Sequence, residues 1–165
     1  DVHDLAYIGP AVAAEQLTQK LKEYGYKDDV SILDLGCGTG LAGEQLHKRG
    51  YKNVDGLDLS QELLKVAQAK GTYRSLQQGR MGFDQCKDLG VAADQYDAVI
   101  SVGVFTAGHV KGKGLDDFVH VVKPGGLASI GVNGNAADDP RYQYHEKMNQ
   151  LSVEGKWKLI SKYYE

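Results

Sequence analysis

Two acidic residues lie on either side of a glycine-rich stretch in the first half of the sequence. The stretch runs from Gly36 to Gly40, follows an apolar run, precedes a helical pattern, and has Asp34 two residues before it. Glycine lets the backbone turn sharply and approach a ligand closely, and a helix start offers free amides with a partial positive charge. Asp34 adds a carboxylate that can pair with an ammonium group. A ligand that carries both a carboxylate and an amino group suits this combination better than a pyrophosphate does.

Asp58 is the second acidic candidate. It ends a second apolar run, 18 residues past Gly40, where a carboxylate can bind both hydroxyls of a ribose. Such hydrogen bonds are charge-assisted and contribute about 1.5–3 kcal/mol each. The alternative is that Asp58 only helps to cap the helix that Ser60 begins.

Alternating strands and helices must position these groups. Apolar β-rich runs predict strands, and apolar residues at helical spacing predict helices. The predicted strands cover 30–35, 53–57, 72–78, 96–102, 127–132 and 157–163, and the predicted helices cover 10–24, 41–49, 60–71, 84–91, 114–122 and 139–151. Pro10 suits the first turn of the first helix, and residues 123–126 predict a turn. The alternation indicates an α/β fold with a doubly wound, mostly parallel sheet and helices on both faces.

Length and charge restrict the function further. The chain has 165 residues and a net charge of −3, which predicts one domain over residues 1–165 and argues against general nucleic-acid binding. The sequence contains no run of about 18 apolar residues, so no membrane span is predicted, and no secretory signal is visible. The two cysteines, Cys37 and Cys86, are too few for a disulfide framework and lack zinc spacing. We therefore expect a cytoplasmic protein without a metal site.

Four motifs, in chain order, resemble those of class I S-adenosylmethionine-dependent methyltransferases. They are Leu33–Gly40, Gly56–Ser60, Tyr96–Ile100 and Val122–Gly126. The resemblance spans residues 30–132 and implies a Rossmann-like fold, S-adenosyl-L-methionine as cofactor and S-adenosyl-L-homocysteine as product. Measured against that family, the chain is expected to be a fragment trimmed at both ends, without the N-terminal lid helix and the seventh strand.

The resemblance also implies a cofactor site. Asp34 would hold the methionine ammonium, Asp58 would accept the ribose hydroxyls, and Leu59 would pack on the adenine. The loop glycines would wrap the methionine and the ribose, while the segments after the third and fourth strands would meet the adenine and the methionine moiety. The implied contacts are Asp34, Gly36, Cys37, Gly38, Gly40, Asp58, Leu59, Arg80, Met81, Gly82, Ser101, Val102, Gly103 and Tyr7. For Tyr7 the alternative is an aromatic anchor that holds the first helix to the sheet.

His109 follows the predicted fourth strand on the loop that should face the substrate, so it is the candidate general base; its alternative is a loop histidine without a role. A small molecule is the expected acceptor, with a protein or peptide as the second choice. No nucleic-acid or membrane partner is predicted, and the sequence gives no strong sign of a protein partner. Two other functions stay open. A nicotinamide-dependent oxidoreductase is disfavoured because Leu41 stands where its third spaced glycine belongs. A module that binds the cofactor or its product without catalysis cannot be separated by sequence.

Overall fold

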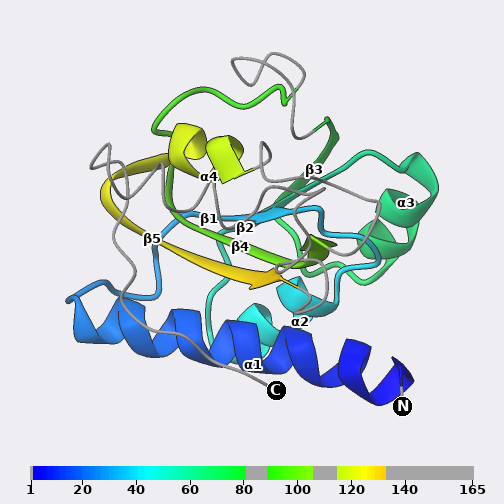
Figure 1. Cartoon of the computed structure of the whole chain (residues 1–165), viewed down its shortest axis with the longest axis horizontal. Coiled ribbons are helices and arrows are strands. Elements are labelled where there is room, and N and C mark those ends of the chain that lie inside the picture. The colour runs from blue at the N-terminus through cyan, green and yellow to red at the C-terminus, as the bar shows by residue number, and fades with distance from the viewer. Residues whose placement is uncertain (1, 81–88, 106–114, 133–165) are drawn as a thin grey trace, which may run out of the picture.

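The computed structural model describes residues 2–80, 89–105 and 115–132 of the chain (Figure 1). Nine elements lie in these ranges. They are α1 (Val2–Glu23), β1 (Ile32–Leu35), α2 (Leu41–Lys48), β2 (Val54–Asp58), α3 (Gln61–Ala69), β3 (Ser75–Gln78), β4 (Tyr96–Phe105), α4 (Leu115–Val121) and β5 (Val122–Val132). Although α1 is 22 residues long, neither it nor any other described helix is apolar enough over its length to cross a membrane.

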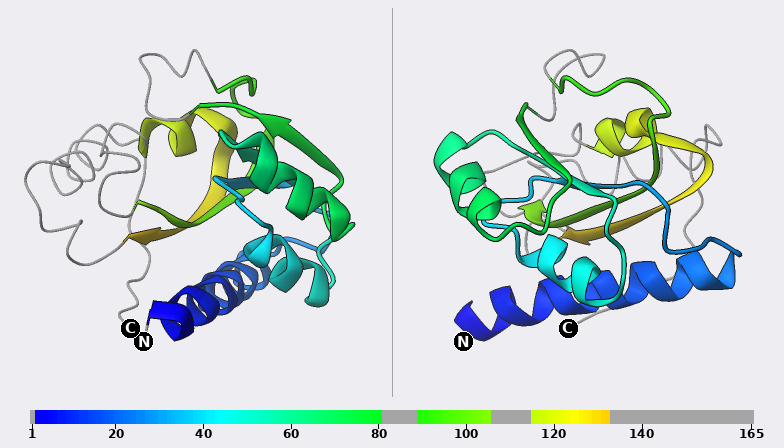
Figure 2. Two further views of the ribbon diagram at one scale, coloured as in Figure 1. Left: turned by 90° about the vertical axis from the view of Figure 1, so that its right-hand side faces the viewer. Right: turned by 180° about the vertical axis from the view of Figure 1, so that it is seen from behind.

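The strands form one sheet in the order β3-β2-β1-β4-β5, and every neighbouring pair is parallel. Helices α1 and α2 cover one face, and α4 lies over the other (Figures 1 and 2). The prediction of a doubly wound α/β fold is confirmed. Because β1 is central, the chain continues to β2 on one side and to β4 on the other. The carboxyl end of β1 is therefore the switch point at which such sheets bind ligands.

A hydrophobic core lies between helices α1 and α2 and one face of the sheet. Ala14, Leu17 and Leu21 recur at helical spacing and are buried against strand residues such as Ile32 and Ile100. Each fully buried leucine or isoleucine side chain contributes about 1.5–3 kcal/mol through removal of apolar surface from water. This packing fixes α1 along the sheet and holds β1 in its central place.

Helix α1 begins earlier than the sequence predicts. It runs from Val2 and contains Pro10, so the prediction that Pro10 opens the helix was wrong. Inside a helix, proline removes one backbone N–H donor and its ring crowds the carbonyl of the residue four positions earlier, at a cost of about 3 kcal/mol. The local signal at Pro10 therefore favours a helix start, which the structure does not have.

The three largest differences between predicted and observed strand boundaries lie in β3, β4 and β5. Strand β3 begins at Ser75 rather than at residue 72, and β4 continues to Phe105. Strand β5 begins at Val122 and absorbs the predicted turn as an irregularity, because Tyr96 pairs with Val122 and Ala98 already pairs with Leu127. Of the helix predicted over 84–91, residues 89–91 are not helical. Its remaining residues, and the elements predicted over 139–151 and 157–163, lie outside the described residues.

A hydrogen-bonded cluster joins β2, β4 and the segment before β3. The Asp55 carboxylate in β2 accepts two hydrogen bonds from Arg74, at 3.0 and 2.8 Å, and one from the Tyr96 hydroxyl in β4 at 2.8 Å. Burial would raise the pKa of Asp55, but the hydrogen bonds from Arg74 and Tyr96 outweigh it and lower that pKa. The cluster thus satisfies a buried charge and ties the segment before β3 to the sheet.

Candidate functional site

The glycine-rich loop leaves the carboxyl end of β1 and enters α2. Gly36, Gly38 and Gly40 have φ values of +71°, +55° and +97°, in the left-handed region that favours glycine. The amides of Gly36 and Cys37 donate to the Leu57 carbonyl oxygen at 2.8 and 3.0 Å. The loop is therefore fastened to β2, and Gly40 brings the start of α2 to the carboxyl edge of the sheet.

Asp58 lies against this loop. Its Oδ2 accepts a hydrogen bond from the Gly38 amide at 2.9 Å, and its Oδ1 accepts one from the Ser60 amide at 2.9 Å. Ser60 in turn accepts a hydrogen bond from the Leu63 amide and caps α3. Asp58 therefore orders the turn before α3, as its alternative role requires. Each carboxylate oxygen has a second acceptor position, so hydroxyl groups of a ligand can still bind there.

Leu59 follows Asp58 and has 54% of its surface exposed. A large apolar side chain beside a carboxylate at a ligand-binding edge offers a surface on which a flat ring can pack. The Gly79 amide donates to the Asp58 carbonyl oxygen at 3.1 Å, so the segment that leads to Arg80 reaches the same edge.

Asp34 is buried at the end of β1, with 1% of its surface exposed. Its Oδ2 accepts a hydrogen bond from the Tyr73 hydroxyl at 2.6 Å. Burial raises the pKa of Asp34 to about 7; the Tyr73 hydroxyl and the Gly43 amide oppose this rise, while the Asp58 charge adds to it. The carboxyl group therefore changes ionisation near neutral pH, which is unusual for aspartate.

Tyr73 is absent from the residues that sequence reasoning selected. It lies in the strand predicted over 72–78, where a tyrosine is a common residue and indicates no particular function. A signal was present in Gly43 and Gly56, which interrupt a helix and a strand at positions where glycine is unfavourable. Glycine inside regular elements indicates the close approach of another group. At Gly43 that group is the Tyr73 ring, and at Gly56 it is the ring together with the closer Leu76 and Cys37 side chains.

Two further predicted residues lie at this edge. Cys37 is a free, buried thiol, and burial raises its pKa, with the Asp34 and Asp58 charges adding to the rise. It is therefore a protonated, unreactive thiol. Ser101 in β4 is fully buried, and its Oγ has no hydrogen-bond partner within the described ranges. Its neighbour Ile100 pairs with Asp34, so a polar ligand group at this edge would relieve the cost of an unpaired hydroxyl.

The remaining predicted residues are not tested by these contacts. Val102 is half-buried after Ser101, Gly103 continues β4, and Tyr7 lies in α1. Met81, Gly82 and His109 lie outside the described residues.

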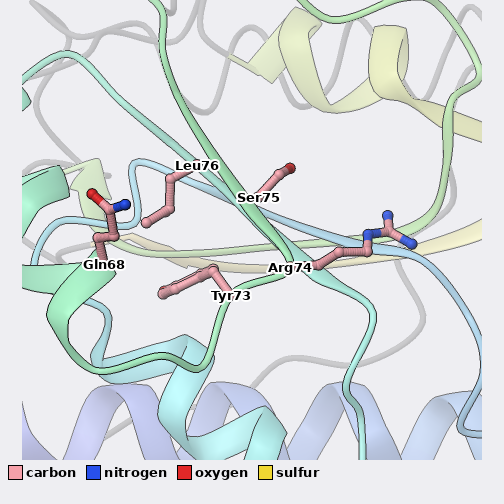
Figure 3. Close-up of a pocket in the computed structure, with 5 residues that line it drawn as sticks. All are labelled: Gln68, Tyr73, Arg74, Ser75 and Leu76. Carbon is pink, nitrogen blue, oxygen red and sulfur yellow. The ribbon is translucent and has the colours of Figure 1, made fainter.

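A pocket of about 190 Å³ lies beside β3, away from the carboxyl edge of the sheet (Figure 3). It is lined by Gln68, Tyr73, Arg74, Ser75 and Leu76. Ser75 begins β3, whereas Asp58 pairs with Gln78 at the other end of that strand. The pocket is therefore not at the carboxyl edge, and we place the candidate cofactor site at the glycine loop instead.

A parallel sheet with a glycine loop after β1 and an acidic residue at the end of β2 defines a Rossmann-like nucleotide-binding domain. A family model described as a methyltransferase domain matches residues 32–126. The chain therefore belongs to the methyltransferase domain family, and its fold is that of the class I S-adenosylmethionine-dependent enzymes.

Similar proteins support this assignment. The human methyltransferase-like protein 27 is 34% identical over 161 residues, which are 95% of this chain and 62% of that protein. An uncharacterised methyltransferase of Bacillus subtilis is 30% identical and covers 79% of this chain and 72% of its own length. A shorter match, 38% identical, covers 43% of this chain and 23% of an 18S rRNA (guanine-N(7))-methyltransferase of Arabidopsis thaliana.

The fold also matches solved structures. A TehB-like S-adenosylmethionine-dependent methyltransferase of Corynebacterium glutamicum has a TM-score of 0.57 at 22% identity, covering 86% of this chain and 82% of that one. The chain spans 62% of the human relative's length.

Proposed function

We propose that this domain binds S-adenosyl-L-methionine at the glycine loop and transfers its methyl group to a small-molecule acceptor. The observation that carries the proposal is the hydrogen bond from the Gly38 amide to Asp58, which holds the glycine loop and the acidic residue together. Both lie at the switch point of the sheet, in a chain that belongs to a methyltransferase family. When bound, the cofactor supplies a methyl group already activated by a positively charged sulfur, so the protein mainly aligns the acceptor.

The residues present fit this cofactor. Asp58 offers acceptor positions for the ribose hydroxyls, and Leu59 offers an exposed apolar surface for the adenine. The buried hydroxyl of Ser101, which has no partner among the described residues, and the carboxyl group of Asp34 lie on the neighbouring strands β4 and β1, where the methionine end of the cofactor would bind. Arg80, Met81, Gly82, Val102, Gly103 and Tyr7 remain proposed contacts, and His109 remains the proposed base.

Family membership leaves the nicotinamide-dependent alternative without support. A methyltransferase and a module that only binds the cofactor would use the same site, so a measurement of methyl transfer is needed to distinguish them. We further propose that residues 1–165 form a single domain, and that the domain works in the cytoplasm because two cysteines suit a reducing compartment.

Replacement of Asp58 tests the site. Asp58→Ala removes the charge-assisted acceptors, so we expect affinity for S-adenosyl-L-methionine and S-adenosyl-L-homocysteine to fall by about 2–4 kcal/mol. Calorimetric titration with both ligands, and with NADH in parallel, measures this. The matched control is Asp94→Asn, which removes one negative charge at an exposed residue whose φ of +55° asparagine tolerates.

Unchanged affinity in the Asp58 variant would contradict the proposal that Asp58 binds the ribose hydroxyls. Binding of NADH alone would instead support the oxidoreductase function. The protein is then incubated with S-adenosyl-L-methionine and candidate acceptors. Formation of S-adenosyl-L-homocysteine separates the enzyme from a module that only binds the cofactor.

A further inference from the structure

The Tyr73 ring occupies a space that exists because three residues lack side chains. A Cβ atom at Gly40 would lie 3.0 Å from a ring atom of Tyr73, and one at Gly43 would lie 2.5 Å from the Tyr73 hydroxyl oxygen. A Cβ atom at Gly56 would also lie 3.0 Å from the ring, with Leu76 and Cys37 closer still, at 2.6 and 2.9 Å. These glycines come from the loop, from β2 and from α2. The ring therefore fills the junction of three segments of the candidate cofactor site.

Other contacts hold the ring in this junction. The Glu44 carboxylate in α2 forms an ion pair with Lys70 at 3.0 Å, which fastens α2 to the segment that leads from α3 to Tyr73. On the other side, Gln68 and Leu76 lie with the ring beside the pocket, while Arg74 points away toward Asp55 (Figure 3). The Tyr73 hydroxyl is thereby directed inward, to Asp34.

We propose that Tyr73 is a positioning residue of the cofactor site: its ring supports the glycine loop, and its hydroxyl orients the Asp34 carboxylate toward the ammonium group of the cofactor. The inference rests on the proposed function. Tyr73 need not contact the cofactor in this role, because it acts through Asp34.

The charges around Asp34 show why this hydrogen bond matters. The titratable groups that influence it are Asp58, at the end of β2, Cys37 in the loop, and Tyr73 itself, while α2 contributes the Gly43 amide. Burial and the Asp58 charge both oppose ionisation of Asp34, and the Tyr73 hydroxyl favours it. An ammonium group binds the ionised carboxylate, so loss of the hydroxyl should weaken ammonium binding most where Asp34 is partly protonated.

The variant Tyr73→Phe tests this role because it keeps the ring and removes only the hydroxyl. We expect the midpoint of Asp34 ionisation, followed by carboxyl ¹³C NMR in the ligand-free protein, to rise by about one pH unit. At pH 7 the dissociation constant for S-adenosyl-L-homocysteine should then increase about fivefold, and the difference from the wild type should shrink toward pH 8.5.

A second ligand separates positioning from general damage to the loop. 5′-Methylthioadenosine keeps the adenine and ribose but lacks the ammonium group, so its affinity should stay within about twofold in Tyr73→Phe. Tyr26→Phe is the matched control, because it removes one tyrosine hydroxyl that donates to the Gly125 carbonyl oxygen at 2.9 Å, away from the loop. It should change neither affinity.

The outcomes are distinct. If the wild-type protein binds neither ligand, the proposed function fails and the positioning role fails with it. If the wild type binds both ligands, and Tyr73→Phe weakens neither or weakens both alike, only the positioning role is overturned. An unshifted Asp34 midpoint also overturns it.

Discussion

At the scale of the residue, Asp34 links the stability of the protein to pH. Its pKa is raised from the ordinary value of 3.8 to about 7 by burial, so the folded protein holds a proton that the unfolded chain has released. The stabilisation is fully present below about pH 4 and is lost as pH rises toward 7. Over this window the free energy of unfolding should fall by up to about 1.4 kcal/mol per pH unit.

Asp34→Asn should remove this dependence, because the amide cannot ionise and its oxygen can still accept from Tyr73. Urea unfolding at pH 5 and pH 8 measures the change. We expect the wild type to lose more stability than the variant between these two values. Equal losses would show that Asp34 ionises in the folded protein as it does in water.

At the scale of the element, α2 contains a glycine that packing requires. In an exposed helix, replacement of glycine by alanine stabilises by about 1 kcal/mol. At Gly43 the new methyl group would instead overlap the Tyr73 ring, so Gly43→Ala should destabilise the protein by about 1–3 kcal/mol. Thermal or urea unfolding measures the sign.

The double variant Gly43→Ala with Tyr73→Leu is the control for this change. A smaller side chain at Tyr73 makes room for the methyl group, so the two effects should be clearly non-additive. A stabilising Gly43→Ala would mean that the ring does not lie against α2.

The same elements show what the sequence could predict. The strand before the loop, the loop itself and α2 depend on local signals: a β-rich run, three spaced glycines and a helical pattern. The place of Asp58 also follows, because it ends a strand that pairs in parallel with β1. The start of α1 does not follow, because Pro10 favours the first turn of a helix whereas the helix continues through it. Tyr73 was missed because its role depends on Gly40, Gly43 and Gly56, which only the folded structure brings together.

At the scale of the whole molecule, charge bears on the choice of acceptor. A relative that methylates 18S rRNA shares 38% identity, but the match covers only 43% of this chain. Affinity for RNA depends on cations that neutralise phosphates and release counterions. This chain has 19 lysines and arginines against 22 aspartates and glutamates, a net charge of −3 that disfavours binding to a polyanion at neutral pH.

We therefore expect this chain to show no saturable binding to a structured RNA, such as an 18S rRNA fragment, at physiological salt. Fluorescence anisotropy at 50 and 200 mM salt, with and without S-adenosyl-L-homocysteine, measures this, and a basic RNA-binding domain serves as the positive control. Non-specific binding should also stay weak at low salt, because repulsion acts most strongly where screening is least. Saturable binding whose affinity falls steeply with salt would contradict the small-molecule proposal, since it would reveal a local cationic surface that the net charge conceals.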